Sequence, residues 1–97
     1  MATYIVLANL TDEGLRNIKE STKRADAVQA AAGKFGVRMT HTYWTLGQHD
    51  MVMVVEAPDE ASFTAFGLAI GAQGNVHTQT LRAFTADELD RITGKAS

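Results

Sequence analysis

The sequence predicts an α+β fold built on a four-stranded antiparallel sheet, and three observations lead to this prediction. Four β-rich runs, at residues 3–9, 37–46, 49–57 and 75–84, alternate with two helical segments in the order β-α-β-β-α-β. The second and third runs are separated only by Gly47-Gln48, which suits a tight type II′ hairpin turn. The first and third runs carry apolar side chains on both faces, which is typical of strands at the centre of a sheet.

The first helical segment begins after Thr11, which can cap a helix, and Asp12 and Glu13 suit the positive end of the helix dipole. Apolar residues then recur at steps of three or four, which predicts one helical stripe. Ser21-Thr22 offers a break where a second helix can begin. The stripe consists of Leu15, Ile18, Ala25, Val28, Ala32 and Phe35.

The second helical segment begins at Pro58, which suits a first helical position, with Asp59 and Glu60 in the first turn. It places Phe63, Phe66 and Ile70 on one side and ends near Gly71 and Gly74. A capping-box pattern, Thr85-Ala86-Asp87-Glu88, predicts a short last helix that carries Leu89 and Ile92.

With the first and third strands central, the sheet has the order 4-1-3-2, which is the ferredoxin-like arrangement. Two helices cover only one face of such a sheet, so the other face leaves Met, Val and Leu side chains in water. We therefore expect a second copy to pack its sheet against the first in an isologous homodimer, a dimeric α+β barrel. The alternative is that the short last helix folds back over this face.

Composition bounds the function. The chain has 97 residues, which we expect to form one domain spanning 1–97, and its 9 basic and 11 acidic residues give a net charge of −2. Such a chain binds polyanions poorly, so no nucleic-acid partner is expected. The absence of cysteine excludes disulfides and thiolate chemistry. No apolar run approaches the ~20 residues of a membrane span, and we expect no membrane partner and a cytoplasmic location.

Around Gly47-Gln48-His49-Asp50 the chain resembles the GYD domain family, with His49 in place of the family's usual Tyr. The resemblance extends over nearly the whole chain. It is carried by Leu10-Thr11, Gly14, Ile18-Lys19-Glu20-Ser21, Arg24, Tyr43, Leu46-Gly47, Glu56-Ala57-Pro58-Asp59, Gly74-Asn75-Val76, Thr78, Thr80, Leu81 and Arg82. It implies a dimeric α+β barrel and names no reaction. A similar hairpin in the effector-binding domains of Lrp/AsnC-type regulators favours ligand sensing by analogy.

The candidate ligand-binding residues are polar and aromatic side chains at the end of the first strand, on the second strand and in the hairpin: Asn9, His41, Tyr43, Trp44, Gly47, His49 and Asp50. The main hypothesis is a small-molecule binding or sensing module. The alternatives are a cofactor-independent oxygenase or isomerase acting on a small metabolite in the barrel, and a domain used only for assembly. Turn formation by Gly47 and Asp50 and packing by the aromatic residues explain the same pattern without a ligand.

Three histidines, His41, His49 and His77, raise the question of a metal. His41 and His77 fall on opposite edges of the predicted sheet, roughly 14 Å apart, which is too far for one zinc ion. Edge strands of two copies could bring His41 and a partner's His77 together, but a third ligand is not evident. We therefore predict no metal site and no cofactor.

Overall fold

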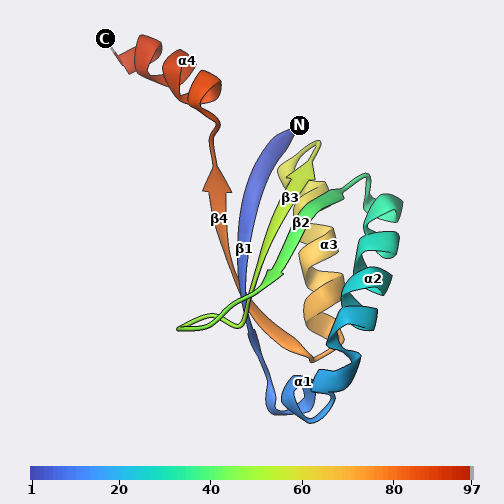
Figure 1. Ribbon diagram of the computed structural model, residues 1–97. Helices are drawn as coiled ribbons and strands as arrows, with labels where there is room; N and C mark the ends of the chain where they lie inside the picture. The colour runs from blue at the N-terminus through green and yellow to red at the C-terminus, as the bar shows by residue number, and fades with distance from the viewer. Residues whose placement is uncertain (97) are drawn as a thin grey trace.

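A computed structural model describes residues 1–96 and confirms the α+β prediction (Figure 1). The strands are β1 (Ala2–Leu10), β2 (Arg38–Trp44), β3 (Met51–Ala57) and β4 (Val76–Ala83). Their order is β2-β3-β1-β4, which is the predicted 4-1-3-2 counted from the other edge, and all three pairings are antiparallel. The two strands that are apolar on both faces are therefore central, as expected.

The first helical segment is divided into short pieces: a second helix begins at Ser21, where the sequence offered a break, and the apolar stripe does not follow one continuous helix. It consists of α1 (Asp12–Arg16), the 3₁₀ turn η1 (Ile18–Glu20), α2 (Ser21–Ala32) and the 3₁₀ turn η2 (Gly33–Phe35). The chain turns at Asn17, where α1 ends, and this turn leaves Leu15 54% and Ile18 46% exposed. Thr11 caps α1 as predicted, because its Oγ1 accepts the N–H of Gly14 at 3.1 Å.

The second half contains α3 (Glu60–Ala72) and α4 (Ala86–Ala96). Asp59 is the cap of α3 rather than a first-turn residue, since its carboxylate accepts the N–H of Ser62 at 2.7 Å. This bond lowers the pKa of Asp59. Pro58 therefore precedes the cap and lies outside the helix. The last helix begins where its capping box predicts, at Thr85 and Glu88.

The core lies between one face of the sheet and the helices α2 and α3. Alternate residues of the two central strands point into it, and they are almost fully buried because both helices cover them. Tyr4 of β1 stacks on Phe63 of α3 with ring centroids 4.0 Å apart. The buried apolar residues are Tyr4, Val6, Ala8, Ala32, Val37, Met39, Met51, Met53, Val55, Ala57 and Phe66.

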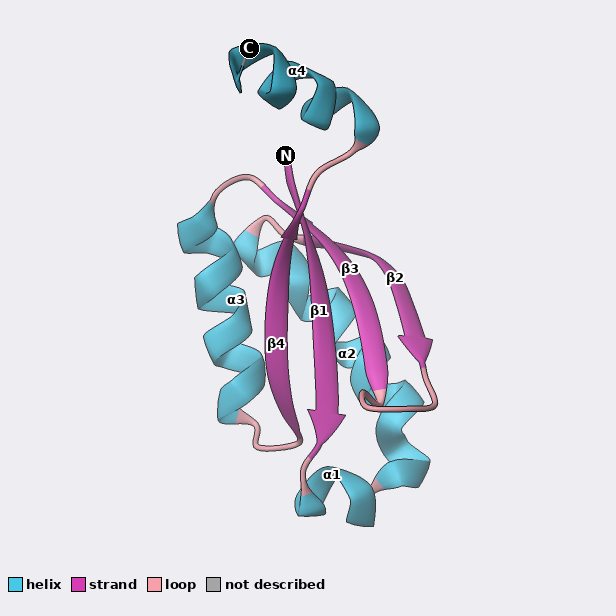
Figure 2. Cartoon of the chain, turned by 90° about the vertical axis from the view of Figure 1, so that its left-hand side faces the viewer, coloured by secondary structure: helices cyan, strands magenta, loops and turns pink. Residues whose placement is uncertain are grey.

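The other face of the sheet has no helix over it, and we call it the open face (Figure 2). The strand register brings Ile5 opposite Val54 and Leu81, and Leu7 opposite Val52. These five side chains form the apolar centre of the open face.

Two expectations about this face are corrected by the structure. The methionines of β3 lie in the core and not on the open face, because the pleat turns them toward the helices. Helix α4 extends beyond the end of the sheet and does not fold back over it, so the alternative cover is not observed.

The hairpin between β2 and β3 is longer than predicted. Strand β2 ends at Trp44 and β3 begins at Met51, so residues 45–50 form a loop. Thr45 closes this loop by donating its N–H to the Asp50 carbonyl at 2.8 Å and its hydroxyl to the His49 carbonyl at 2.6 Å. Trp44 still lies opposite Met51, which is the register that a turn at Gly47-Gln48 requires.

Candidate functional site

A bulge in β2 separates the candidate residues His41 and Tyr43 from the preceding part of the strand. The register shifts between Met39 and His41, so Thr40 is the extra residue. Because of this shift, Met39 points into the core, while His41 and Tyr43 point to the open face beside Val54 and Val52. His41 and Tyr43 thus share a face, as the predicted hairpin register implied.

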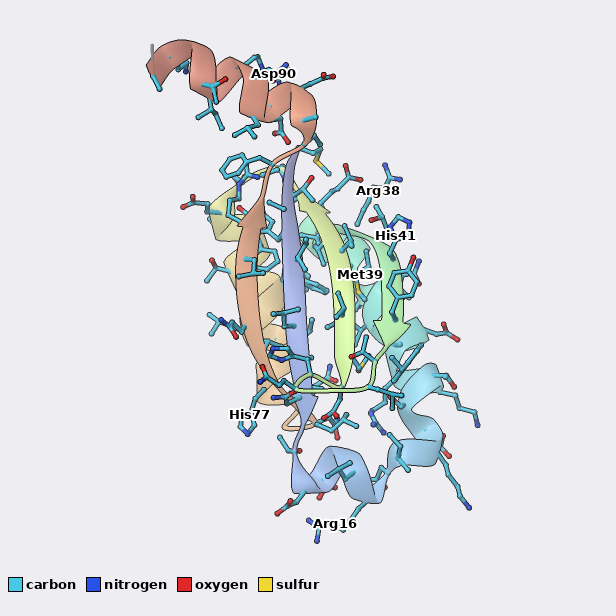
Figure 3. The ribbon with its side chains drawn as sticks, turned by 60° about the vertical axis from the view of Figure 1, so that its left-hand side comes forward. Arg16, Arg38, Met39, His41, His77 and Asp90 are labelled. Carbon is cyan, nitrogen blue, oxygen red and sulfur yellow. The ribbon has the colours of Figure 1, made fainter. Side chains whose placement is uncertain are left out.

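His41 and Tyr43 form an aromatic pair at the edge of the open face. Their ring centroids are 6.1 Å apart with an angle of 14° between the planes, and Tyr43 is 55% exposed. Nδ1 of His41 lies 3.1 Å from the Thr40 hydroxyl oxygen, which fixes one side of the imidazole. Figure 3 shows His41 on the outer strand, directed away from the helices. The pair is therefore available to whatever covers the open face.

Asn9 and Asp50 join the hairpin to the central strand. The Asp50 carboxylate accepts the N–H of Leu10 at 2.9 Å, and the Asp50 N–H donates to the Ala8 carbonyl at 2.9 Å and to Asn9 Oδ1 at 3.3 Å. Asp50 therefore continues the pairing of β3 with β1 past the end of the strand. This structural role occupies one of its carboxylate oxygens.

Gly47 and His49 lie in the hairpin loop. Gly47 has φ of 115°, a conformation that favours glycine, so the loop needs a residue without a side chain there. The adjacent Leu46 is completely exposed. The loop thus presents an apolar side chain at its tip.

Trp44 faces the opposite way and does not join the His41–Tyr43 pair. Its indole N–H donates to the Ser21 hydroxyl at 2.9 Å, and Ser21 is itself buried. This bond fixes the end of β2 to the first residue of α2. Sequence reasoning missed Ser21, because a serine at the start of a helix reads as a cap.

A narrow cavity of about 50 Å³ lies under α2 and α3. The sulfur-bearing side chains of Met39, Met51 and Met53 line it, and Arg24 lies at its rim. Arg24 donates to the Asn17 carbonyl at 2.8 Å, so it ties α1 to α2. None of the seven candidate residues lines this cavity.

The histidines lie apart, with His41 on β2 and His77 on β4, at opposite edges of the sheet (Figure 3). Within residues 1–96, no three His, Asp or Glu side chains are grouped as metal ligands. In the same range, none of the helices combines the length and apolar character needed to cross a bilayer.

The candidate residues therefore occupy three places: the edge of the open face, the hairpin clamp and the helix side of β2. The open face is the best candidate for a functional surface, because it combines apolar side chains with the exposed His41–Tyr43 pair.

Comparisons with known proteins find similarity to this chain in sequence and in fold. The sequence model of the GYD domain matches residues 4–93. The chain is 39% identical over 90 residues to the glutamine synthetase and cystathionine beta-lyase binding protein of Thermus thermophilus, covering 92% of this chain and 95% of that protein. The crystal structure of TTHA0845 from Thermus thermophilus is similar in fold, with a TM-score of 0.57 and 24% identity over 89% of this chain and 96% of that one.

Proposed function

Since the chain belongs to the GYD domain family, we propose that it is a binding module in which two copies pair through their open faces and the pair docks on a metabolic enzyme. The observation that carries the proposal is the uncovered apolar face of the sheet. A relative that is 39% identical is named for binding glutamine synthetase and cystathionine beta-lyase, which supports enzymes of these two kinds as partners.

The chemistry of the open face supports pairing with a second copy. Its centre is made by Ile5, Leu7, Val52, Val54 and Leu81, and soluble monomers rarely leave such a contiguous apolar surface in water. When two identical open faces pack together about a two-fold axis, the apolar centre of each copy is buried against that of the other.

The exposed area also supports a pair. One chain exposes 6404 Å². A compact monomer of 10.5 kDa exposes roughly 5,400 Å² by the usual scaling of surface with mass. The difference, roughly 1,000 Å², is close to the ~800 Å² that each partner contributes to an interface of standard size.

Another exposed apolar side chain lies in the hairpin loop, which projects on the side of the sheet that no helix covers (Figure 1). Leu46 is fully exposed there on a loop that the Thr45 and Asp50 bonds hold in place. An apolar side chain on a held loop is a suitable anchor for a partner enzyme, since little conformational entropy is lost when it inserts into a pocket.

A second candidate function is retention of a small molecule between the paired faces. The observation that favours it is the exposed His41–Tyr43 pair at the edge of the open face, where an imidazole and a phenol are both available for hydrogen bonding.

The test uses light scattering and a binding assay on purified proteins. We expect the wild type to have twice the mass of one chain, and Leu7→Lys to shift the mass toward 10.5 kDa because it puts a charge at the centre of the open face. Thr78→Lys is the matched control, since Thr78 is exposed on the helix side of β4. Circular dichroism checks that each variant folds.

Immobilised wild-type protein should also bind glutamine synthetase or cystathionine beta-lyase purified from the same organism. Leu46→Ser should weaken that binding, and light scattering on the same variant reports whether the mass of the pair changes as well. A wild-type mass near 10.5 kDa contradicts the pairing, and failure to bind either enzyme contradicts the proposed partners.

A further inference from the structure

We infer that α4 is a docking arm: its apolar side packs on the second copy of the chain rather than on its own. This inference depends on the pairing proposed above and identifies a segment that crosses from one copy to the other.

Helix α4 has a defined start in its own sequence. The Thr85 N–H donates to the Glu88 carboxylate at 2.9 Å, and the Glu88 N–H donates to the Thr85 hydroxyl at 3.2 Å, which makes a reciprocal capping box. The first of these bonds is the main reason why the pKa of Glu88 is lowered. The segment is therefore a helix with a fixed first turn.

The apolar side of α4 has no cover from its own chain. Leu89 is 51% exposed and Ile92, three residues later on the same side, is 42% exposed. No residue of Ala86–Ala96 is buried. An isolated helix shorter than about 12–15 residues is marginal in water, so an 11-residue helix depends on packing for its stability.

Helix α4 lies away from α2 and α3 of the same chain. It follows the edge strand β4 after only two residues and lies beyond the end of the sheet (Figures 1 and 2). Leu81 on the open face and Leu89 and Ile92 on the helix are exposed apolar side chains, whereas Phe84 in the link lies against the Arg82 guanidinium at 4.5 Å. Figure 1 shows that α4 leans toward the side of the sheet that no helix covers, which is the side of the proposed interface.

The shape of one chain shows that α4 projects from the rest of the fold. Its radius of gyration is 14.6 Å, whereas a compact domain of this length has about 12.5 Å. Its extents are 51 × 31 × 18 Å, so the chain is long and thin along the direction in which α4 projects. In a face-to-face pair the arm passes the end of its own sheet, and the partner is the source of apolar surface there.

The first test compares two double variants of α4. Leu89→Ser with Ile92→Ser removes the apolar side, and Asp90→Ser with Arg91→Ser changes the polar side without altering the net charge. We expect the first pair to weaken dimerisation at least about tenfold and the second to leave it within about twofold. Both variants should fold, because α4 lies outside the core.

The second test locates the arm directly. A benzophenone amino acid replaces Ile92, and two forms of the chain with different tags are mixed and irradiated. We expect a covalent product that carries both tags, with the attachment site on the partner's peptide.

The outcomes separate the arm from the pairing. Two results would contradict the packing of α4 on the partner and leave the pairing through the open face intact. One is that Leu7→Lys dissociates the pair while the Leu89→Ser/Ile92→Ser variant does not. The other is a cross-link that forms only within one chain. A wild type that is monomeric at all concentrations overturns both.

Discussion

At the scale of single residues, Gly14 shows how a close backbone approach controls local structure. A Cβ at this position would collide with the backbone carbonyl oxygen of Asn75 and would lie 3.1 Å from Cδ2 of Leu10. The contact is reinforced by Thr11, whose N–H donates to the same Asn75 carbonyl at 3.0 Å. Only glycine therefore allows α1 to lie against the loop before β4.

We expect Gly14→Ala to destabilise the protein by about 1–3 kcal/mol, because the added methyl group forces α1 and the loop apart. Gly67→Ala is the control: its Cβ meets nothing within 4 Å in the middle of α3, so it should stabilise by roughly 0.4–1 kcal/mol. Urea unfolding followed by circular dichroism measures both. Equal effects of the two variants would contradict the role assigned to the Asn75 contact.

The residue scale also shows what local sequence conveys. The caps at Thr11 and at Thr85 with Glu88 were predictable, because a cap is formed between residues three positions apart. The clamp made by Asp50 was not, because its carboxylate bonds the Leu10 N–H from 40 positions away. The sequence indicated that Asp50 suits a turn or a ligand site, and neither interpretation included this contact with Leu10.

At the scale of elements, the start of α3 depends on a carboxylate. The N–H of Ser62 donates to Asp59, and the Ser62 hydroxyl adds a second, smaller interaction, so the pKa of Asp59 is lowered from 3.8. Because the pKa of this carboxylate is lower in the folded state than in the unfolded chain, its ionised form stabilises the fold at pH values above the pKa of the unfolded chain. This contribution is lost as the pH falls through the folded value.

The expected outcome is a pH-dependent difference between the wild type and Asp59→Asn, a variant that still caps the helix but does not titrate. The wild type should be the more stable of the two at pH ~7, and the difference should diminish as the pH falls below 3.8, the ordinary pKa from which that of Asp59 is lowered. Urea midpoints across this range provide the measurement, and a difference independent of pH would contradict the assignment.

Element boundaries were less predictable than element types. The break at Asn17 interrupts an apolar pattern that continues with helical spacing on both sides, so periodicity alone could not reveal it. The bulge at Thr40 adds one residue to β2, and a period-two pattern contains no sign of such an insertion. The bulge puts Met39 in the core although His41, two residues later, faces the open side, so the position of Met39 required the structure.

At the scale of the whole molecule, the sheet order followed from the sequence because the central strands must bury both faces. The same argument predicted that one face would remain open, and the structure agrees. The position of α4 could not be deduced, since a short amphipathic helix suits its own open face as well as a partner's.

Pairing has a consequence for stability that can be measured without any variant. Association that occurs only between folded chains stabilises them by mass action. We expect the thermal midpoint to rise when the protein concentration is raised from about 1 to about 100 μM. Differential scanning fluorimetry follows this change, and a midpoint that stays constant over the range would indicate that folded chains do not associate.

The exposed edge of strand β4 affects how the protein folds when it is synthesised in a cell. Its outer side offers a row of backbone donors and acceptors without a neighbouring strand in the sheet, and the eight-residue strand contains no proline or lysine to discourage a foreign strand. A newly synthesised chain that has not yet paired with a second copy is therefore prone to cross-β aggregation through this edge. Slow synthesis and early encounter between nascent chains should raise the soluble yield.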